Sequence, residues 1–174
     1  MSDRARHICI LLHGVETAAG EITWAERLAL TAPQQVICPI EWNARSYGGL
    51  VLSKTSALAT WFGSYRQGLV AREREYFREL RRIVGPDTHV SIVAHSFGGY
   101  ITLELLRSGF VFHRIVMIAP AGDENFDWQM HERQFDLGWV YWSRNDEVIP
   151  WAYYGKLGAV GSAQKHPKVQ SIET

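Results

Sequence analysis

The residues most able to do chemistry lie in the run Ser91-Ile-Val-Ala-His95-Ser96-Phe-Gly-Gly99. An apolar strand ends just before Ser96, two glycines follow, and an apolar helix is expected from Tyr100 to Leu106. A serine at so sharp a strand-to-helix turn has a strained backbone, projects its hydroxyl from the sheet and needs small residues two positions away. Ala94 and Gly98 are those small residues. The pattern predicts that Ser96 is a nucleophile, and the alternative is an ordinary helix cap.

A second group of candidates follows the first apolar strand, at His13-Gly14-Val15. In acyl transfer the substrate carbonyl becomes an oxyanion, which preorganised backbone N–H groups stabilise. We expect the amides of Val15 and Phe97 to be these donors, because one follows the tight turn and the other follows Ser96. His13 and Gly14 would shape the adjoining substrate-binding loop. Taken alone, His13-Gly14 is equally typical of an ordinary strand-exit turn.

A carboxylate lies just beyond the fifth apolar run, in Ser143-Arg-Asn-Asp146-Glu-Val-Ile-Pro150. A carboxylate in that place can hold a catalytic histidine in one tautomer and stabilise its imidazolium form. The sequence therefore favours Asp146 as the acid of a triad, with Asp123 in reserve. The alternative is that Asn145 and Asp146 only form a turn.

Six short apolar runs predict the strands that position these groups. Most are continuous rather than alternating, which is typical of a parallel sheet covered on both faces. The runs are His7–Leu12, Gln35–Ile40, Thr88–Ala94, Arg114–Ala119, Gly138–Trp142 and Val169–Glu173, the last of which alternates and suits an edge.

Helical patterns separate these strands. A capping box at Thr23 and Glu26 opens a helix over Trp24–Leu30, and an amphipathic helix over 69–84 ends at Gly85-Pro86. In the second helix Leu69, Tyr76 and Ile83 recur every seven residues, with Val70, Phe77, Leu80 and Val84 alongside, and the Arg-Glu-Arg-Glu run at 72–75 is expected to face solvent. The alternation predicts one α/β domain over residues 1–174, a three-layer α/β/α sandwich with a mostly parallel sheet of about six strands.

The composition excludes several classes of function. Eighteen acidic side chains balance eighteen basic ones, so there is no electrostatic signature of binding to nucleic acid or an anionic membrane. No apolar run reaches the length of about eighteen residues that a membrane span needs, and no signal peptide is visible. Cys9 and Cys38 fall in predicted strands without metal or redox spacing, which indicates core residues in a reducing compartment, the cytoplasm.

These motifs, in this order, resemble the α/β-hydrolase superfamily of serine hydrolases. The matching residues are His13-Gly14, Ala94-His95-Ser96-Phe97-Gly98 and Ser143-x-Asn-Asp146-x-Val-x-Pro150. The resemblance covers nearly the whole chain and is to the compact esterases and lipases, whose sheet lacks two leading strands. It implies that Ser96 is the nucleophile and Asp146 the triad acid, with Val15 and Phe97 forming the oxyanion hole. No cofactor is implied.

The family pattern also requires a histidine after the last strand, and none follows Val169–Glu173. Without a base, a serine hydroxyl is a poor nucleophile near neutral pH. One explanation is a chain truncated before its histidine loop. Another is that His166 acts as the base, although it should enter the last strand at the far end of the sheet. The third is a domain that only binds. His95 is expected to point away from Ser96, and no cluster has the ligand spacing of a metal site.

The expected substrate is a small-molecule carboxylic ester, lipid or thioester. Aromatic residues that could line its pocket occur at Trp61-Phe62, Phe126-Asp-Trp128 and Trp151, although the same residues could be core. Two functions therefore stay open. One is a serine hydrolase acting through an acyl-enzyme on Ser96, and the other is a non-catalytic hydrolase-fold module that binds a small molecule or a partner.

Overall fold

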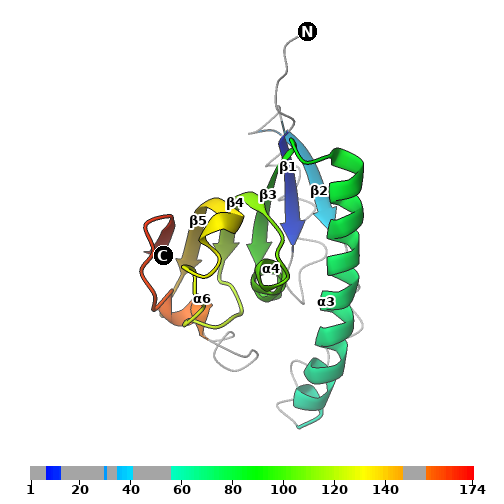
Figure 1. Cartoon of the computed structure of the whole chain (residues 1–174). Coiled ribbons are helices and arrows are strands. Elements are labelled where there is room, and N and C mark those ends of the chain that lie inside the picture. Colours follow the sequence, from blue (N-terminus) through cyan, green and yellow to red (C-terminus); the bar gives the residue numbers. More distant parts are fainter. Residues whose placement is uncertain (1–6, 13–29, 31–34, 41–55, 147–155) are drawn as a thin grey trace.

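A parallel sheet of six strands forms the centre of the protein, in the order β2-β1-β3-β4-β5-β6 (Figure 1). The computed structural model describes residues 7–12, 30, 35–40, 56–146 and 156–174, with the side chains at 35, 38–40 and 56–66 left aside. All five strand pairings are parallel. The strands are β1 (His7–Leu12), β2 (Gln35–Ile40), β3 (His89–His95), β4 (Phe112–Ile118), β5 (Phe135–Trp142) and β6 (Val169–Glu173). The predicted α/β class and six-stranded sheet are confirmed.

The strand order reverses between β1 and β3. The chain passes from β1 to β2 in one direction and then returns across β1 to β3, after which β4, β5 and β6 follow in sequence. In an open α/β sheet, ligands bind outside the carboxyl ends of the strands at such a reversal. The registers place Leu12 of β1 beside Ala94 of β3, so the residues that follow these two strands flank this point.

Two helices, α3 (Ser56–Val84) and α4 (Phe97–Arg107), pack against each other and therefore lie on the same face of the sheet (Figure 1). A single turn of helix, α6 (Leu157–Val160), lies beside β5. A 3₁₀ turn, η1 (Glu132–Gln134), comes directly before β5 in the chain. The end of α3 was predicted correctly, because Gly85 has φ 81° and its N–H caps the carbonyl of Arg81. The helix expected over 24–30 lies outside the described residues, apart from Leu30.

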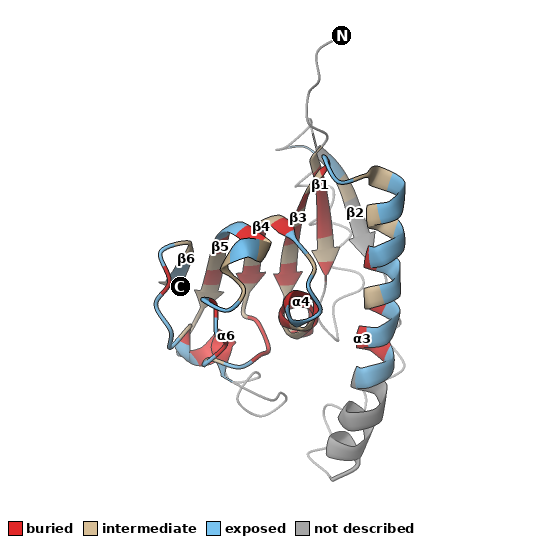
Figure 2. Ribbon diagram, in the orientation of Figure 1, coloured by how far each residue is buried: buried red, intermediate tan, exposed pale blue. Residues whose placement is uncertain are grey.

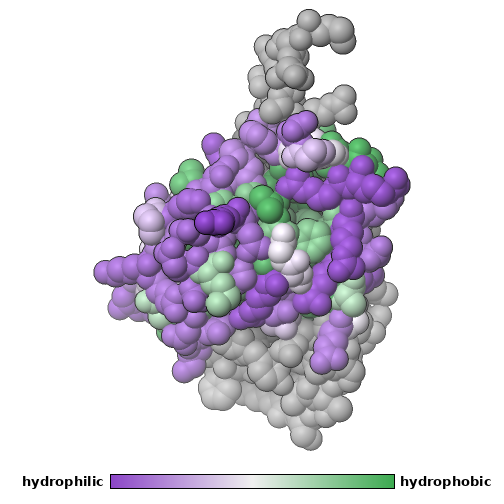
Figure 3. Space-filling view, in the orientation of Figure 1, coloured by the Kyte–Doolittle hydropathy of each residue, from purple (hydrophilic) through white to green (hydrophobic). Residues whose placement is uncertain are grey.

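The apolar face predicted for α3 is confirmed in part. Tyr76 and Ile83 are exposed, whereas Leu69, Val70 and Phe77 are buried. The buried stripe runs through Val70 and Phe77, which are seven positions apart, and Leu80 and Val84 pack against the same core. The charged run is not wholly solvated either, since Glu73 is 2% exposed. Other charged side chains of α3 line its outer surface in Figure 3, at the right of the view.

Apolar side chains from the sheet, α4 and part of α3 form one core. Figure 2 colours the ribbon of the buried residues red. Phe126 and Trp128 belong to this core, each 1% exposed. They therefore do not line a pocket, as the sequence had allowed, and the Trp128 indole donates a hydrogen bond to Ser162 Oγ at 2.9 Å. Cys9 is buried in β1, as predicted. Within the described part of the chain, no helix is long and apolar enough to cross a bilayer.

Candidate active site

Ser96 occupies the turn between β3 and α4 in a backbone conformation that few residues adopt. Its φ is 53° and its ψ is −119°. Positive φ brings the Cβ of an L-residue close to its own backbone, and such conformations cost about 1–3 kcal/mol when the surrounding structure imposes them. The sequence predicted this strained strand–turn–helix junction, and the structure confirms it.

Three backbone hydrogen bonds impose this conformation. The Ser96 N–H donates to the carbonyl of Ile118, the last residue of β4, at 3.1 Å. The Ser96 carbonyl accepts from the amides of Gly99 and Ala121, at 2.9 and 2.8 Å. Both polar groups of the serine backbone are thus used within the fold.

The two glycines of the motif let neighbouring chain segments close around the turn. A Cβ on Gly98 would lie 2.5 Å from the carbonyl oxygen of Leu12, the last residue of β1. A Cβ on Gly99 would lie 2.4 Å from the side chain of Pro120, just after β4. The start of α4 is therefore held between the carboxyl ends of β1 and β4. It follows β3 directly and so lies beside the point where the strand order reverses.

The Ser96 hydroxyl does not cap α4. Ser96 is the N-cap residue by position, yet its side chain makes no capping hydrogen bond. An N-cap serine has extended backbone angles that direct its oxygen at the second or third amide of the helix, and the angles of Ser96 differ from these. The ordinary cap is therefore excluded as the reason for a serine here, and the side chain is partly exposed.

Asp146 lies at the same edge of the sheet, after β5. Its amide closes a turn by donating to the Ser143 carbonyl at 3.0 Å, and the residue is partly buried. The turn interpretation thus holds for its backbone, and its carboxylate acts electrostatically on His95. Asp123, the reserve candidate, is exposed and its carboxylate accepts the Asn125 N–H at 2.9 Å, which is ordinary turn chemistry.

His95 interacts with Asp146. Burial lowers the pKa of His95 below its ordinary value, and the negative charge of Asp146 opposes this shift. The neutral imidazole is thus the favoured form, at the residue directly before Ser96. No local pattern indicated this pairing, because 51 positions separate the two residues and only the β3–β4–β5 registers align them.

His166 lies at the opposite edge of the sheet from Ser96. It precedes β6 beside the first residue of β5, with its ring centroid 6.0 Å from that of Phe135. It is 7% exposed rather than a surface residue, and its Nδ1 accepts the Lys168 amide at 3.2 Å. The structure therefore does not bring His166 together with Ser96 or Asp146, and this correction follows from the parallel strands, whose first and last residues lie at opposite edges.

The predicted oxyanion donors are only partly described. Phe97 is the buried first residue of α4, at the helix end that carries a partial positive charge. His13, Gly14 and Val15 lie outside the described residues. Leu12, the residue directly before them, packs closely against Gly98 in the turn after Ser96. Of the predicted pocket residues, Trp61 and Phe62 belong to α3, where side chains are left aside, and Trp151 lies outside the described residues.

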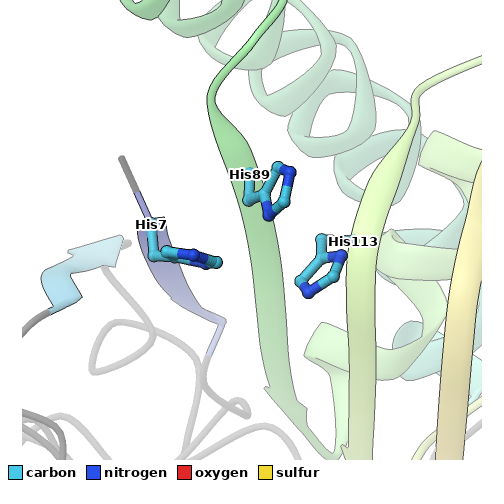
Figure 4. Close-up of side chains that lie close together, drawn as sticks. All are labelled: His7, His89 and His113. Carbon is cyan, nitrogen blue, oxygen red and sulfur yellow. The ribbon is translucent and has the colours of Figure 1, made fainter. Parts of the chain in front are cut away.

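The amino ends of the strands carry a group that the sequence did not predict. His7 of β1, His89 of β3 and His113 of β4 have ring nitrogens within 4.8 Å of one another (Figure 4). Burial, followed by the charges of His89, His113 and Arg114, lowers the pKa of His7. The sequence placed no metal here because the spacings, 82 and 24 positions, match no ligand motif. Strand pairing alone brings these side chains together.

Comparisons with known proteins add no family assignment. No family model matches the chain, and no curated protein matches it. One solved structure, a phospholipase PlaB from Legionella pneumophila in complex with thio-NAD, aligns with 66% of this chain at 14% sequence identity and a TM-score of 0.30. The chain spans 25% of that protein's length. A likeness this low carries no argument about function, so the function has to be argued from the site.

Proposed function

We propose that this protein is a serine hydrolase that cleaves a carboxylic ester, lipid or thioester through an acyl-enzyme on Ser96. The observation that carries the proposal is the conformation of Ser96, strained at φ 53° and locked by three backbone hydrogen bonds, with no capping role for its hydroxyl. Strained residues cluster at functional sites, where the strain presets the geometry that the reaction needs. A purely structural turn could be made here by glycine without that cost.

In the proposed reaction, Ser96 Oγ attacks the substrate carbonyl carbon and gives its proton to a base. The amides of Phe97 and Val15 would stabilise the resulting oxyanion, each contributing on the order of 3 kcal/mol. Collapse of the tetrahedral intermediate releases the alcohol or thiol, which takes up the proton. Water then hydrolyses the acyl-enzyme and restores the serine. Asp146 would orient and stabilise the protonated base.

The geometry does not support His166 as that base. Of the histidines that the structure describes, His95 is the one at the carboxyl edge of the sheet, next to Ser96 in sequence and paired electrostatically with Asp146. The family resemblance instead calls for a histidine loop after β6. These two sources of the base make different predictions about substitutions in the present chain, and the experiment below separates them.

A fluorophosphonate probe tests the nucleophile. It should label the 174-residue chain at Ser96, and Ser96→Ala should abolish the label. Ser108→Ala is the matched control, because Ser108 ends α4 with its hydroxyl bonded to the Glu104 carbonyl and should leave labelling unchanged. Labelling that persists in Ser96→Ala, or that is absent from both this chain and a chain extended beyond Thr174, contradicts the proposal.

The same probe locates the base. If His95 takes the proton, His95→Gln should slow labelling of the present chain at least tenfold. If the base lies in a loop after β6, the extended chain should label much faster than the present one, and His95→Gln should change the extended chain little. His166→Gln should leave labelling unchanged in both chains.

A non-catalytic binding module is the second candidate, and the position of His166 favours it. His166, one of the bases considered from the sequence, lies at the edge of the sheet opposite Ser96 and therefore does not take up the Ser96 proton. A binding module predicts no covalent labelling and a ligand affinity that Ser96→Ala leaves unchanged.

A further inference from the structure

Three imidazoles converge at the edge of the sheet opposite Ser96. They come from the first residues of β1 and β3 and the second residue of β4, which are adjacent strands. His7 meets His89 edge-on with ring centroids 4.8 Å apart, and His89 stacks on His113 at 4.4 Å. Figure 4 shows the three rings gathered in front of the strands that carry them. Parallel registers fix this grouping, because His7 pairs directly with His89.

We propose that His7, His89 and His113 bind one divalent transition-metal ion, of which Zn²⁺ is the best fit. Neutral imidazole is a good ligand for zinc, copper and nickel, and three protein ligands with a water in the fourth position is a common zinc arrangement. The site would tie three strands together at their amino ends. It is independent of the hydrolase proposal, which concerns the other edge.

A carboxylate already orients one of the rings as a metal ligand. His113 Nδ1 lies 2.7 Å from Asp136 Oδ2, at the start of β5. If Nδ1 carries the proton and donates it to this carboxylate, Nε2 keeps its lone pair for a metal. Metal-binding histidines usually have such a carboxylate or carbonyl partner, which fixes the tautomer and raises the basicity of the ligand.

A second ring has a nitrogen that the protein leaves without a partner. His89 Nδ1 is buried and makes no hydrogen bond to any described residue. Buried polar atoms nearly always have partners, and an exception calls for a specific reason such as an ion that completes the site. A ligated metal drawing the three rings together would provide that reason.

The distances are close to those of a zinc site. With Zn–N bonds near 2.05 Å and tetrahedral angles, ligand nitrogens lie about 3.4 Å apart. The present nitrogens, all within 4.8 Å, need to approach by at most about 1.4 Å. Rotation about the histidine side-chain bonds can supply this movement of the nitrogens. The same rotation must also unstack the rings of His89 and His113, so that a nitrogen of each points at the ion. Arg114 lies near His7 and opposes a cation, while Asp136 favours one.

Calorimetric titration of the full chain with ZnCl₂, after dialysis against a chelator, tests the site. We expect one ion per chain with a dissociation constant of about 1 µM or lower. Titration with CoCl₂ should give the strong visible absorption of a four-coordinate nitrogen-rich site. Binding weaker than about 100 µM, or a stoichiometry other than one ion per chain, would overturn the proposal.

Substitutions assign the ion to these residues. His89→Gln and His113→Gln should each weaken zinc binding at least about 100-fold, and Asp136→Asn should weaken it about 10- to 100-fold. His131→Gln is the matched control, because His131 stacks on Phe126 away from the cluster, and it should bind zinc as the parent chain does. Circular dichroism without metal checks that each variant is folded. Parent-like zinc affinity in folded His89→Gln and His113→Gln variants would overturn the assignment.

Discussion

Ser96 shows how a single residue can concentrate conformational strain. Both of its backbone polar groups are bonded to other segments, and the residue keeps a φ of 53° that glycine would adopt without cost. Ala119, which follows β4 at the same edge, also has a positive φ, of 42°. Two strained residues thus lie at neighbouring strand ends of this edge, and strain of this kind clusters at functional sites.

Replacing Ser96 by glycine should therefore stabilise the fold. Ser96→Gly relieves the strain of about 1–3 kcal/mol but adds flexibility to the unfolded chain, so we expect it to exceed Ser96→Ala in free energy of unfolding by about 1 kcal/mol. Urea denaturation of both variants measures the difference. Ser96→Ala keeps the strained Cβ and serves as the control. Equal stability of the two variants would show that the turn is not strained.

His95 should make the fold sensitive to mild acid. Its pKa is lowered in the folded state, chiefly by burial, so between the folded and unfolded pKa values the unfolded chain binds more protons. The stabilisation from neutral His95 is complete above the unfolded pKa of about 6.5 and is lost as the pH falls toward the folded value. The slope from this residue is at most about 1.4 kcal/mol per pH unit.

Urea denaturation of metal-free protein between pH 7.5 and pH 5.5 measures this dependence. His95→Gln should lose a fraction of the slope, because glutamine does not titrate. A parent-like slope in His95→Gln would mean that other groups cause the acid sensitivity.

At the scale of elements, close packing at the β3–α4 junction positions the serine. The first turn of α4 lies so near the end of β1 that only glycine fits at position 98, where a Cβ would meet a backbone carbonyl 2.5 Å away. A backbone atom cannot rotate aside as a side chain can. The turn at Ser96 is thus packed against Leu12, the last residue of β1, which directly precedes the predicted oxyanion residues 13–15.

Gly98→Ala should consequently destabilise the protein by about 1–3 kcal/mol, the usual cost of overpacking. The matched control is Gly68→Ala in the exposed part of α3, where a Cβ would meet nothing within 4 Å. Because alanine favours helix more than glycine does, that control should stabilise the protein by about 0.5–1 kcal/mol. Thermal or urea unfolding distinguishes the two signs. A Gly98→Ala variant as stable as the parent would show that the contact with β1 relaxes freely.

At the scale of the whole molecule, the parallel sheet separates two candidate sites. His89 is the first residue of β3, and Ser96 follows the last residue of β3. The two positions are therefore separated by the length of a seven-residue strand. A strand rises about 3.3 Å per residue, which puts the two positions roughly 20 Å apart. Sites at this distance without shared partners should act independently.

A double-mutant cycle tests this independence. The effects of Ser96→Gly and His89→Gln on the free energy of unfolding should add within about 0.5 kcal/mol in metal-free protein. Urea denaturation of the two single variants and the double variant supplies the numbers. A coupling energy well above 1 kcal/mol would reveal that strain at one edge is transmitted along β3 to the other.

The fold was largely predictable because its signals are local. Short apolar runs marked all six strands, and the bounds of β1, β2 and β6 were correct to the residue. β4 and β5 each start before their predicted strands because Phe112 and Phe135 extend them as core residues. In α3 the predicted face included Phe77, which is buried against the rings of Phe110 and Phe112, but also Tyr76 and Ile83, which are exposed.

The candidate site was predictable only in part. By itself the sequence determined the α/β class and the serine at a strained strand–helix turn, because strand runs, glycines and the turn between them lie within a few residues of one another. Only the tertiary structure decided three further points. The charge of Asp146 acts on His95, His166 lies at the edge of the sheet opposite Ser96, and the rings of His7, His89 and His113 lie close together. Each of those facts depends on which strands are neighbours and in what register. Pairing between segments tens of residues apart is set by the packing of the whole sheet, and no local pattern encodes it.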